Sequence, residues 1–562
     1  MKKGFCSIGI SISIFLFSIV ARGQQWGDYT LYSNSNSTYA YLLDTNGTIY
    51  HTWTFTSANR TGYSTYMLPG GALVRSVAHS GNSFNGGGMT GQLQKVDWNG
   101  NVTWDYVYST TQYCMHHDIC PMPNGNVLLI SYELKSSVEA SAAGSTSAIT
   151  MWPDKIVEVQ QTGATTGTIV WEWHVWDHLV QNNDSTKSNY HASIIDHPEL
   201  LNINYQTQKD WMHMNGIDYN PLLDQIVVSS HNMDEMYVID HSTTTAEAAG
   251  HTGGRSGKGG DFLYRWGNPD AYDAPGTANF NVIHDAHWVP LDCPRGGYLA
   301  GFNNKGISSN QSCVDFINPP YDGYNYFHTA GTAYAPATYD FRHPANGYTS
   351  NMGNSHQLPN GNMLVCVAFS GYIYEVDSNQ NVLWSKSTGG TTPHAYRYNA
   401  CYTAGTQPTT PLITNNSDTL FASTAAATYV WYFNGTVIPG ASSQSYFPTQ
   451  NGNYQVQAVD AGGCASAISF PYNYLSLEIS SGDMTHKLSL FPNPSSGIVT
   501  IEGAFSWASN YKVIVTDLIG KIVFNGERQY KVDLSSFENG MYQFTVYTED
   551  GRKLTQKLML VK

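Results

Sequence analysis

Three histidines of this 562-residue chain occupy the same place in a repeating sequence unit. They are His117, His213 and His284, and each lies six residues before the residue that opens a turn. A short apolar run follows each turn, so the shared pattern is histidine, strand, tight turn, strand. Equivalent positions of a radial repeat face one central space, and we therefore expect the three imidazoles to converge on one site.

An imidazole can act as nucleophile, acid or base near neutral pH. A single histidine beside a turn is more often a structural hydrogen-bonding residue than a catalyst, but three in one register favour a shared site. His287 and His356 are out of register with the trio, and we expect them to be mainly structural, although His356 could also line the pocket.

The histidines belong to a region, residues 24–402, in which pairs of hairpins recur. One hairpin has a turn such as CPMPNGNVLLI, and the other reads like GQLQKVDWNGNVTWDY. Two hairpins form a four-stranded sheet, which is one propeller blade. Five recognisable units and the strand segment 39–53 predict six blades, with five or seven as the alternatives.

Two smaller β-domains are expected after the repeats. A linker rich in Thr, Pro and Gly spans 403–411, and segment 412–475 reads as an immunoglobulin-like sandwich around Trp431. Alternating strands over 488–562 predict another small β-sandwich. The fold class is thus all-β: a six-bladed β-propeller followed by two sandwiches.

The N-terminus and the composition predict an exported protein. Residues 1–23 have the basic start, apolar stretch and small-residue cleavage region of a signal peptide. No later apolar run has the length of a transmembrane helix. A net charge of −15 with only 12% charged residues disfavours binding to nucleic acid or to anionic membranes.

Seven of the eight cysteines remain once Cys6 leaves with the signal peptide. Export permits disulfides, and an odd number leaves at least one thiol unpaired, for which Cys464 is the candidate. The pairs closest in sequence are Cys114 with Cys120 and Cys293 with Cys313.

The repeat region resembles the bacterial arylsulfate sulfotransferase family over most of residues 40–400. The likeness rests on HHD followed by PNGN, DWMHMNGIDYN, IVVSSH, KGGDFLYRWGNP, HDAHW and LPNGNMLV, in that order. The resemblance implies a six-bladed propeller that moves a sulfuryl group from a phenolic sulfate to a phenolic acceptor. It also implies a ping-pong route through a sulfated histidine, without nucleotide, metal or other cofactor.

By the same resemblance, His284 matches the nucleophile, His213 matches the histidine of the DWxHxN motif, and His117, rather than His116, matches the third. The family has an arginine where this chain has His231. A guanidinium is permanently charged and grips two sulfate oxygens, whereas a histidine is charged only below about pH 6.5. Either another cation substitutes, or the activity is weakened or redirected.

Sulfuryl transfer requires donors aimed at three equatorial oxygens and a nucleophile in line. A second imidazolium can protonate the departing phenolate, an effect of roughly 10²–10⁴-fold. Asp118 or Asp285 could orient an imidazole, and Arg265 could supply the missing positive charge. Three aromatic side chains could stack on an aryl donor: Trp211, Tyr219 and Trp288.

The C-terminal segment 488–562 resembles the sorting domain of proteins exported by the Bacteroidetes type IX secretion system. FPNPSSG near its start and DLSSFENGMYQFTV near its end carry the likeness. It implies recognition by the type IX machinery and a location at the cell surface or in the medium.

Two other functions stay open: a glycan- or surface-binding propeller that kept its histidines as scaffold, and a histidine-ligated zinc or copper site. Substituting His284 by Ala separates all three. The GGRSGKGG run at 253–260 lacks Walker spacing and no helix follows it, so we expect a flexible loop beside the pocket.

Overall fold

The computed structural model describes residues 27–322, 324–416, 418–475, 488–503, 511–517, 521–548 and 553–562. The predicted signal peptide lies outside these residues. The chain forms two compact units, which divide between Tyr474 and Leu475. Among the described residues, none of the helices has the length and apolar character needed to cross a bilayer.

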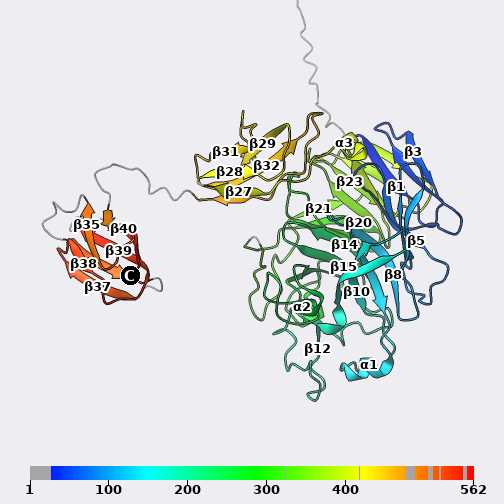
Figure 1. Cartoon of the computed structure of the whole chain (residues 1–562). Helices are drawn as coiled ribbons and strands as arrows, with labels where there is room; N and C mark the ends of the chain where they lie inside the picture. Colours follow the sequence, from blue (N-terminus) through cyan, green and yellow to red (C-terminus); the bar gives the residue numbers. More distant parts are fainter. Residues whose placement is uncertain are drawn as a thin grey trace, which may run out of the picture. The chain divides into compact units, whose positions relative to one another are not determined.

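Residues 29–398 of the first unit form six four-stranded antiparallel sheets, the blades of a β-propeller (Figure 1). The predicted blade number is therefore confirmed. The inner edge strands of five neighbouring pairs of sheets contact each other, and in the sixth pair the inner edge strand of one blade contacts the second strand of the other. Turn chemistry sets the hairpins: Asp97 accepts the Asn101 amide at 2.8 Å, and Gly100 supplies the left-handed φ of +87°.

The strands are given from the inner to the outer edge of each blade. The closing blade has β26 (Ala395–Tyr398), β1 (Tyr29–Ser33), β2 (Tyr39–Leu43) and β3 (Ile49–Thr54). The next has β4 (Thr61–Met67), β5 (Leu73–Ala78), β6 (Gly91–Val96) and β7 (Val102–Val107). The third has β8 (Tyr113–Pro121), β9 (Val127–Glu133), β10 (Asp154–Gln161) and β11 (Gly167–His174).

The remaining three blades follow in the same order. The fourth has β14 (Met214–Asn220), β15 (Gln225–Ser230), β16 (Glu235–Asp240) and β17 (Tyr264–Trp266). The fifth has β18 (Ile283–Trp288), β19 (Leu299–Ser308), β20 (Gln311–Ile317) and β21 (Phe341–Pro344). The sixth has β22 (Asn354–Gln357), β23 (Met363–Val367), β24 (Tyr372–Val376) and β25 (Val382–Ser387).

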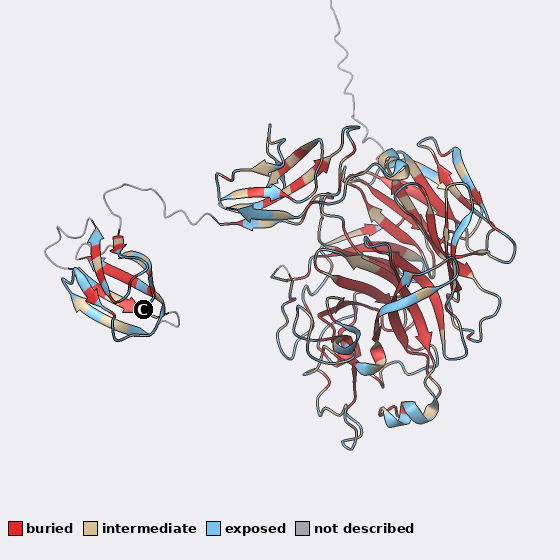
Figure 2. Cartoon of the chain, in the orientation of Figure 1, coloured by how far each residue is buried: buried red, intermediate tan, exposed pale blue. Residues whose placement is uncertain are grey.

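The ring closes by pairing the two ends of the repeat region. Strand β1 pairs with β26, with Tyr29 opposite Tyr398, so the closing blade combines strands from both ends. Buried residues follow the strands throughout this unit (Figure 2). Because the ring is closed, the inner edge strand of each blade is covered by the neighbouring blades.

Three carboxylates tie four successive inner strands together, β8, β14, β18 and β22. Asp118 accepts the Ile217 amide at 3.3 Å, Asp218 accepts the Trp288 amide at 2.9 Å, and Asp285 accepts the Ser355 amide at 2.8 Å. These bonds fix the height of adjacent inner strands around the axis, and hence the relative positions of side chains at the strand ends.

Short elements connect the strands, both within blades and between them. They are α1 (Ser137–Ala142), η1 (Val175–Asp177), β12 (Leu179–Val180), β13 (Leu201–Asn202), α2 (Thr245–Ala248), η2 (Pro269–Tyr272) and α3 (Ala400–Ala404). Both α1 and α2 begin with capping boxes, formed by Ser136 with Glu139 and by Thr244 with Glu247.

Residues 413–474 form two facing sheets. One has β27 (Ile413–Asn416), β28 (Thr419–Ala422) and β31 (Ser445–Tyr446); the other has β30 (Thr436–Val437), β29 (Thr428–Phe433), β32 (Gly452–Val459) and β33 (Tyr472–Tyr474). Trp431 is fully buried in the core, as predicted for a small sandwich. Its closer likeness to an immunoglobulin domain stays a prediction.

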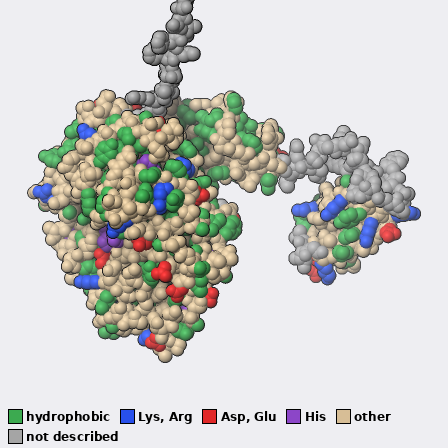
Figure 3. All heavy atoms as spheres, turned by 180° about the vertical axis from the view of Figure 1, so that it is seen from behind, with side chains coloured by type: hydrophobic (Ala, Val, Ile, Leu, Met, Phe, Trp, Pro, Cys, Tyr) green, Lys and Arg blue, Asp and Glu red, His purple; other side chains and the backbone are tan. Residues whose placement is uncertain are grey.

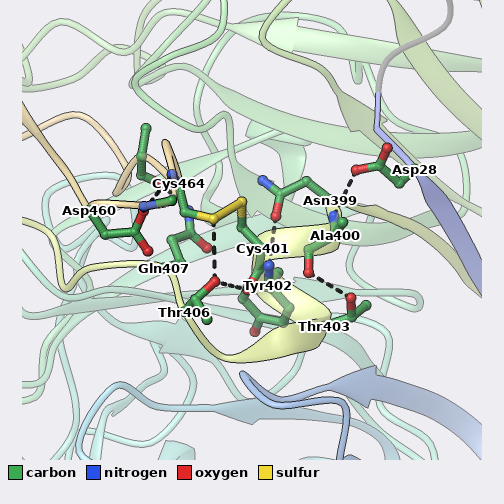
Figure 4. Close-up of a disulfide and its surroundings, with 12 residues drawn as sticks. Asp28, Asn399, Ala400, Cys401, Tyr402, Thr403, Thr406, Gln407, Asp460 and Cys464 are labelled. Atoms are coloured by element: carbon green, nitrogen blue, oxygen red, sulfur yellow. Dashed lines mark hydrogen bonds between the residues drawn. A yellow bond between two sulfur atoms is a disulfide. The ribbon is translucent and has the colours of Figure 1, made fainter.

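A disulfide joins this sandwich to the propeller. Cys401 in α3 pairs with Cys464, which follows β32 (Figure 4). The expectation that Cys464 is unpaired was wrong, because the fold brings it to a cysteine 63 residues away. Cys114, Cys120, Cys293 and Cys313 are free and buried. Cys114 and Cys120 share β8, where six residues span roughly 20 Å, far beyond disulfide reach.

The second unit is also a β-sandwich. Its sheets are β34 (Leu488–Phe491), β35 (Ile498–Gly503) and β38 (Lys531–Asp533), and β37 (Ile522–Glu527), β36 (Tyr511–Thr516), β39 (Gly540–Thr548) and β40 (Lys553–Leu560). Apolar residues alternate inward along these strands, as in β36, where Val513 and Val515 are buried. The predicted all-β architecture is thus confirmed along the described chain.

Figure 3 shows one face of the molecule, where the Lys and Arg side chains of the described residues are scattered among polar and apolar ones. This face carries no continuous basic patch within that part of the chain.

Candidate active site

Four histidines meet at one end of the inner strands. The ring centroids of His117 and His213 are 4.6 Å apart, those of His213 and His231 5.0 Å, and those of His231 and His284 5.8 Å. Because β8, β14 and β18 have the same register around the axis, the three histidines predicted to converge do so. His231, at the end of β15, bridges His213 and His284.

The backbone is irregular where the histidines lie. His117 and His213 have left-handed φ values of 49° and 55°, and Asp285, next to His284, has 58°. The pairing register shifts there, between Met115 and Ile119 in β8 and between His284 and His287 in β18. Such bulges re-aim side chains, and strain of this kind concentrates at functional sites.

Asn304 fixes the tautomer of His284. The Asn304 amide donates to the Thr349 carbonyl at 2.9 Å and to the Met352 carbonyl at 2.8 Å, so its oxygen faces His284. That Oδ1 lies 2.7 Å from His284 Nδ1 and accepts the proton there. The lone pair of His284 is therefore on Nε2. Burial, and next the charge of His231, lower the pKa of His284 well below 6.5, so the ring is neutral.

A carboxylate orients His213. His213 Nδ1 donates to Asp210 Oδ2 at 2.8 Å, and the Tyr132 hydroxyl lies 3.2 Å from the same nitrogen. Although burial opposes the charged form, bonding to His213 lowers the pKa of Asp210 below its usual value. The ionised Asp210 can balance an imidazolium at His213, which leaves its Nε2–H available as an acid.

His117 is hydrogen-bonded to a second buried histidine, His116. His116 Nε2 lies 2.8 Å from Asp154 Oδ1, and its Nδ1 is hydrogen-bonded to His117 Nδ1, also at 2.8 Å. Tyr132 stacks on the His116 ring with centroids 3.7 Å apart. Burial, and next the charge of His213, lower the pKa of His117 well below 6.5. His116 is therefore the orienting residue and His117 the one that faces the cluster.

His231 has Lys305 as a cationic neighbour. Its Nδ1 lies 2.8 Å from Asn232 Oδ1. Burial lowers the pKa of His231, with further lowering by the charges of His213 and Lys305. Lys305 follows Asn304 in β19, so one bulged segment provides both the His284 partner and a positive charge that acts on His231.

A glycine loop lies directly on the rings. A Cβ at Gly88 would lie 2.0 Å from His117 Cε1, and one at Gly87 would lie 2.3 Å from His213 Cε1. The Gly88 carbonyl accepts the His117 amide at 2.7 Å, and the Gly87 amide donates to Asp210 at 3.3 Å. Only glycine allows the backbone to approach this closely.

A further histidine, His394, interacts electrostatically with the cluster. It precedes β26, and its charge contributes to the lowered pKa of His284 after burial and nearer partners. His394 Nδ1 lies 3.3 Å from the Tyr396 hydroxyl, which donates to Tyr66 at 3.1 Å; Tyr66 donates to Asp118 at 2.8 Å. A hydrogen-bonded chain therefore connects His394 to Asp118 on β8.

The structure does not bring Arg265 to the histidines. It lies on the outer strand β17, where its guanidinium forms a fully buried, two-pronged ion pair with Glu235. Its remaining donors bond to the carbonyls of Pro198 and Leu200 at 3.3 and 3.0 Å. Arg265 therefore stabilises blade four, and the expectation that it replaces the family arginine does not fit its position.

The three predicted aromatic contacts also lie elsewhere. Trp211 is fully buried and donates to the Tyr205 carbonyl at 2.9 Å. Trp288 packs in a separate core cluster with Tyr264. Tyr219 is near the opposite end of β14 from His213, where its hydroxyl donates to Asp224 at 2.8 Å. These side chains support the fold around the site.

Sequence reasoning missed the residues that orient the imidazoles. Asp118 and Asp285 accept backbone amides of the next blade, and the imidazole that Asp285 contacts, at 3.3 Å, is that of His287 and not one of the cluster. Asp210 was detectable, since it lies three residues before His213 in DWMH. The GGG run at 86–88 was another signal. Asn304 and Lys305, in GFNNKG, carry no comparable pattern.

Comparison with known proteins yields distant structural matches. A protein of unknown function from Bacteroides caccae matches at 11% identity and a TM-score of 0.39, covering 66% of this chain and 98% of its own. A Pseudomonas aeruginosa periplasmic gluconolactonase matches at 10% identity and a TM-score of 0.33, covering 79% and 96%. No curated protein matches. Scores this low carry no argument about function.

Two family models match the chain. The secretion system C-terminal sorting domain matches residues 489–562, which identifies the chain as one secreted or attached to the cell surface. The arylsulfotransferase (ASST) model matches residues 19–393, a span that includes every histidine of the cluster except His394. The chain therefore belongs to the arylsulfotransferase family, which supports a general aryl sulfotransferase activity.

Proposed function

We propose that this protein transfers a sulfuryl group from a phenolic sulfate ester to a phenolic acceptor through a sulfated His284. The observation that carries the proposal is the Asn304 contact. It holds the His284 proton on Nδ1 and leaves the Nε2 lone pair for attack. A buried, neutral imidazole is a competent nucleophile at neutral pH.

In the first step, His284 Nε2 attacks sulfur, and the N–S bond forms as the bond from sulfur to the phenolic oxygen breaks. The electron pair of that bond stays on the oxygen. His213, balanced by Asp210, donates its Nε2 proton to this oxygen, so the first product leaves as a neutral phenol.

The second step reverses the first with another phenol. His213 Nε2, now deprotonated, takes the acceptor's hydroxyl proton, and the acceptor oxygen attacks sulfur. The N–S bond breaks, and its electron pair returns to His284 Nε2. The enzyme regains its starting protonation state, as a ping-pong cycle requires.

Negative charge on the sulfuryl oxygens needs positive partners. His231 lies between His213 and His284, and Lys305 adds its charge beside His231. We assign these two residues the role that the family arginine would have. His116, with the Asp154 carboxylate 2.8 Å behind it, can orient His117 through the bond between their Nδ1 atoms.

The test is the intact mass of the mature chain after brief exposure to p-nitrophenyl sulfate. We expect an adduct of one sulfuryl group in the wild type and none in His284→Ala. His287→Ala is a matched control, because His287 lies on the same strand but contacts Asp285, so its variant should keep the adduct. Wild-type protein that releases p-nitrophenol without an adduct would argue for direct transfer, and absence of both would refute the proposal.

A further inference from the structure

A second cluster of metal-binding side chain types lies outside the histidine site. His178 Nδ1 is 2.8 Å from Asp261 Oδ1, and His251 Nδ1 is 2.7 Å from the same oxygen. Within the described residues, one donor atom from each of these three side chains lies within 4.8 Å of the others. The side chain of His178 is fully buried, whereas that of His251 is 59% exposed.

His178 is held in one tautomer. Its Nε2 lies 2.8 Å from the Ala248 carbonyl, which only accepts, so this nitrogen carries a proton. The Trp173 indole is nearly parallel to the ring, at 4° with centroids 5.5 Å apart. In the neutral imidazole, Nδ1 therefore directs a lone pair at the Asp261 carboxylate. Two acceptors face each other, and a positive charge must lie between them.

The glycine-rich loop brings the other two side chains to His178. The Gly259 amide donates to the Gly253 carbonyl and the Gly260 amide to the Gly250 carbonyl, both at 3.0 Å. These bonds close the base of the loop and place His251 beside Asp261. A Cβ at Gly260 would lie 2.6 Å from His178 Nε2, so glycine is needed for this approach. The loop therefore has a defined structural role, which its sequence, GGRSGKGG, did not indicate.

The cluster borders an open space. A cavity of about 610 Å³ is lined by Asp261, Lys258, Glu199 and His328, among other residues. A ligand bound at Asp261 would therefore have room for water or another small ligand on its open side.

We propose that His178 Nδ1, His251 Nδ1 and the Asp261 carboxylate bind a divalent transition metal, with zinc as the best-fitting ion. Two imidazoles and one carboxylate form a common zinc ligand set, with a fourth position for water. The Nε2–H bond from His178 to a carbonyl is the arrangement that orients metal-bound histidines. Donors around zinc lie roughly 3.3 Å apart, so the triad must open slightly. The exposed His251 ring can move outward to allow this.

The competing interpretation is a proton-bound triad, in which both histidines donate to Asp261 and no metal is needed. The two interpretations differ in stoichiometry. A metal site binds one zinc ion per chain tightly after chelator treatment, whereas a proton-bound triad retains none.

The experiment is zinc titration of the mature full-length chain after removal of metal with a chelator. We expect one tight site in the wild type. His251→Ala and Asp261→Asn should weaken it by at least roughly 100-fold, since even outer partners of metal ligands contribute ~10–100-fold. These positions are an exposed ring and an isosteric change, so both variants should fold. Cobalt should give tetrahedral absorption bands in the wild type and lose them in both variants.

Two controls localise the ion. His328→Ala changes a histidine that lines the same cavity but bonds to the Thr332 carbonyl, so its zinc affinity should be unchanged. His231→Ala tests whether the propeller-mouth histidines bind the ion instead. Loss of zinc in His231→Ala but not in His251→Ala would overturn the proposal, as would a wild type without a tight site.

Discussion

His231 and His241 follow consecutive strands of one hairpin, β15 and β16, and therefore lie at opposite ends of the same blade. Burial lowers the pKa of His231, and the charges of His213 and Lys305 lower it further. His241 is also partly buried, but it bonds to Asp224 at 2.7 Å and to Glu158 at 3.0 Å. Those carboxylates outweigh burial and raise the pKa of His241 to about 9.

The same side chain is therefore kept neutral at one end of the blade and charged at the other. A neutral imidazole can attack sulfur or accept a proton, whereas an imidazolium between two carboxylates serves as a structural cation. The difference comes from partners that approach from other strands. The following predictions test whether this division holds, beginning with the largest expected effect.

The general acid should show itself through the leaving group. We expect Asp210→Asn to lower the rate of the first step by roughly 10²–10⁴-fold for unactivated phenyl sulfate, because His213 loses its carboxylate partner. The loss should be much smaller for p-nitrophenyl sulfate, whose phenolate needs little protonation. Rates for a series of substituted phenyl sulfates measure this, and equal losses across the series would contradict the role.

Asn304→Asp should make the His284 environment more like that of His241. A carboxylate beside His284 favours the charged imidazole by roughly 1–3 pKa units, so less nucleophile is present at neutral pH. The wild-type pKa is well below 6.5, so the wild-type acid limb lies at low pH. The profile of kcat/KM against pH should show that limb displaced upward in the variant, with activity recovering at alkaline pH. A uniform loss at every pH would indicate a purely structural role for Asn304.

Lys305 tests the replacement of the family arginine. Lys305→Met should raise KM for the aryl sulfate about tenfold, the effect of losing one charged hydrogen bond of roughly 1.5 kcal/mol, and leave the adduct detectable. The variant His231→Arg restores the family residue and should compensate for the loss in the Lys305→Met background. Steady-state kinetics of the two single variants and the double variant measure the coupling, and strict additivity would contradict a shared role.

The repeating features of the blades could be predicted from the sequence, whereas contacts that occur only once in the fold mostly could not. The blade pattern and the register of His117, His213 and His284 follow from local turn and strand signals. Asn304 approaches His284 from the adjacent strand, 20 residues away, so its role depends on pairing within the blade. Asp285, adjacent to His284 in sequence, accepts the Ser355 amide of the next blade instead, because the strand is bulged at this point.

Arg265 and Cys464 show the same limit. Motif position suggested a cation near the site, but β17 is an outer strand, and the partner of Arg265 is Glu235 on β16. The partner of Cys464 lies beyond the whole linker, at Cys401. Contacts between elements distant in sequence depend on the three-dimensional fold. A single sequence does not show which residues of such elements lie opposite each other.

The smallest effect on activity is expected at His241, and it should appear in stability instead. Its folded pKa of about 9 exceeds the unfolded value of about 6.5, so its contribution is full below about pH 6.5 and is lost as pH rises through about 9. His241→Ala should lose about 3 kcal/mol at pH 6, the lower range for breaking a buried pair, and much less at pH 10. Melting temperatures of wild type and variant at both pH values measure this. A constant difference would mean that packing, not charge, gives His241 its role, and the contrast with His231 would then fail.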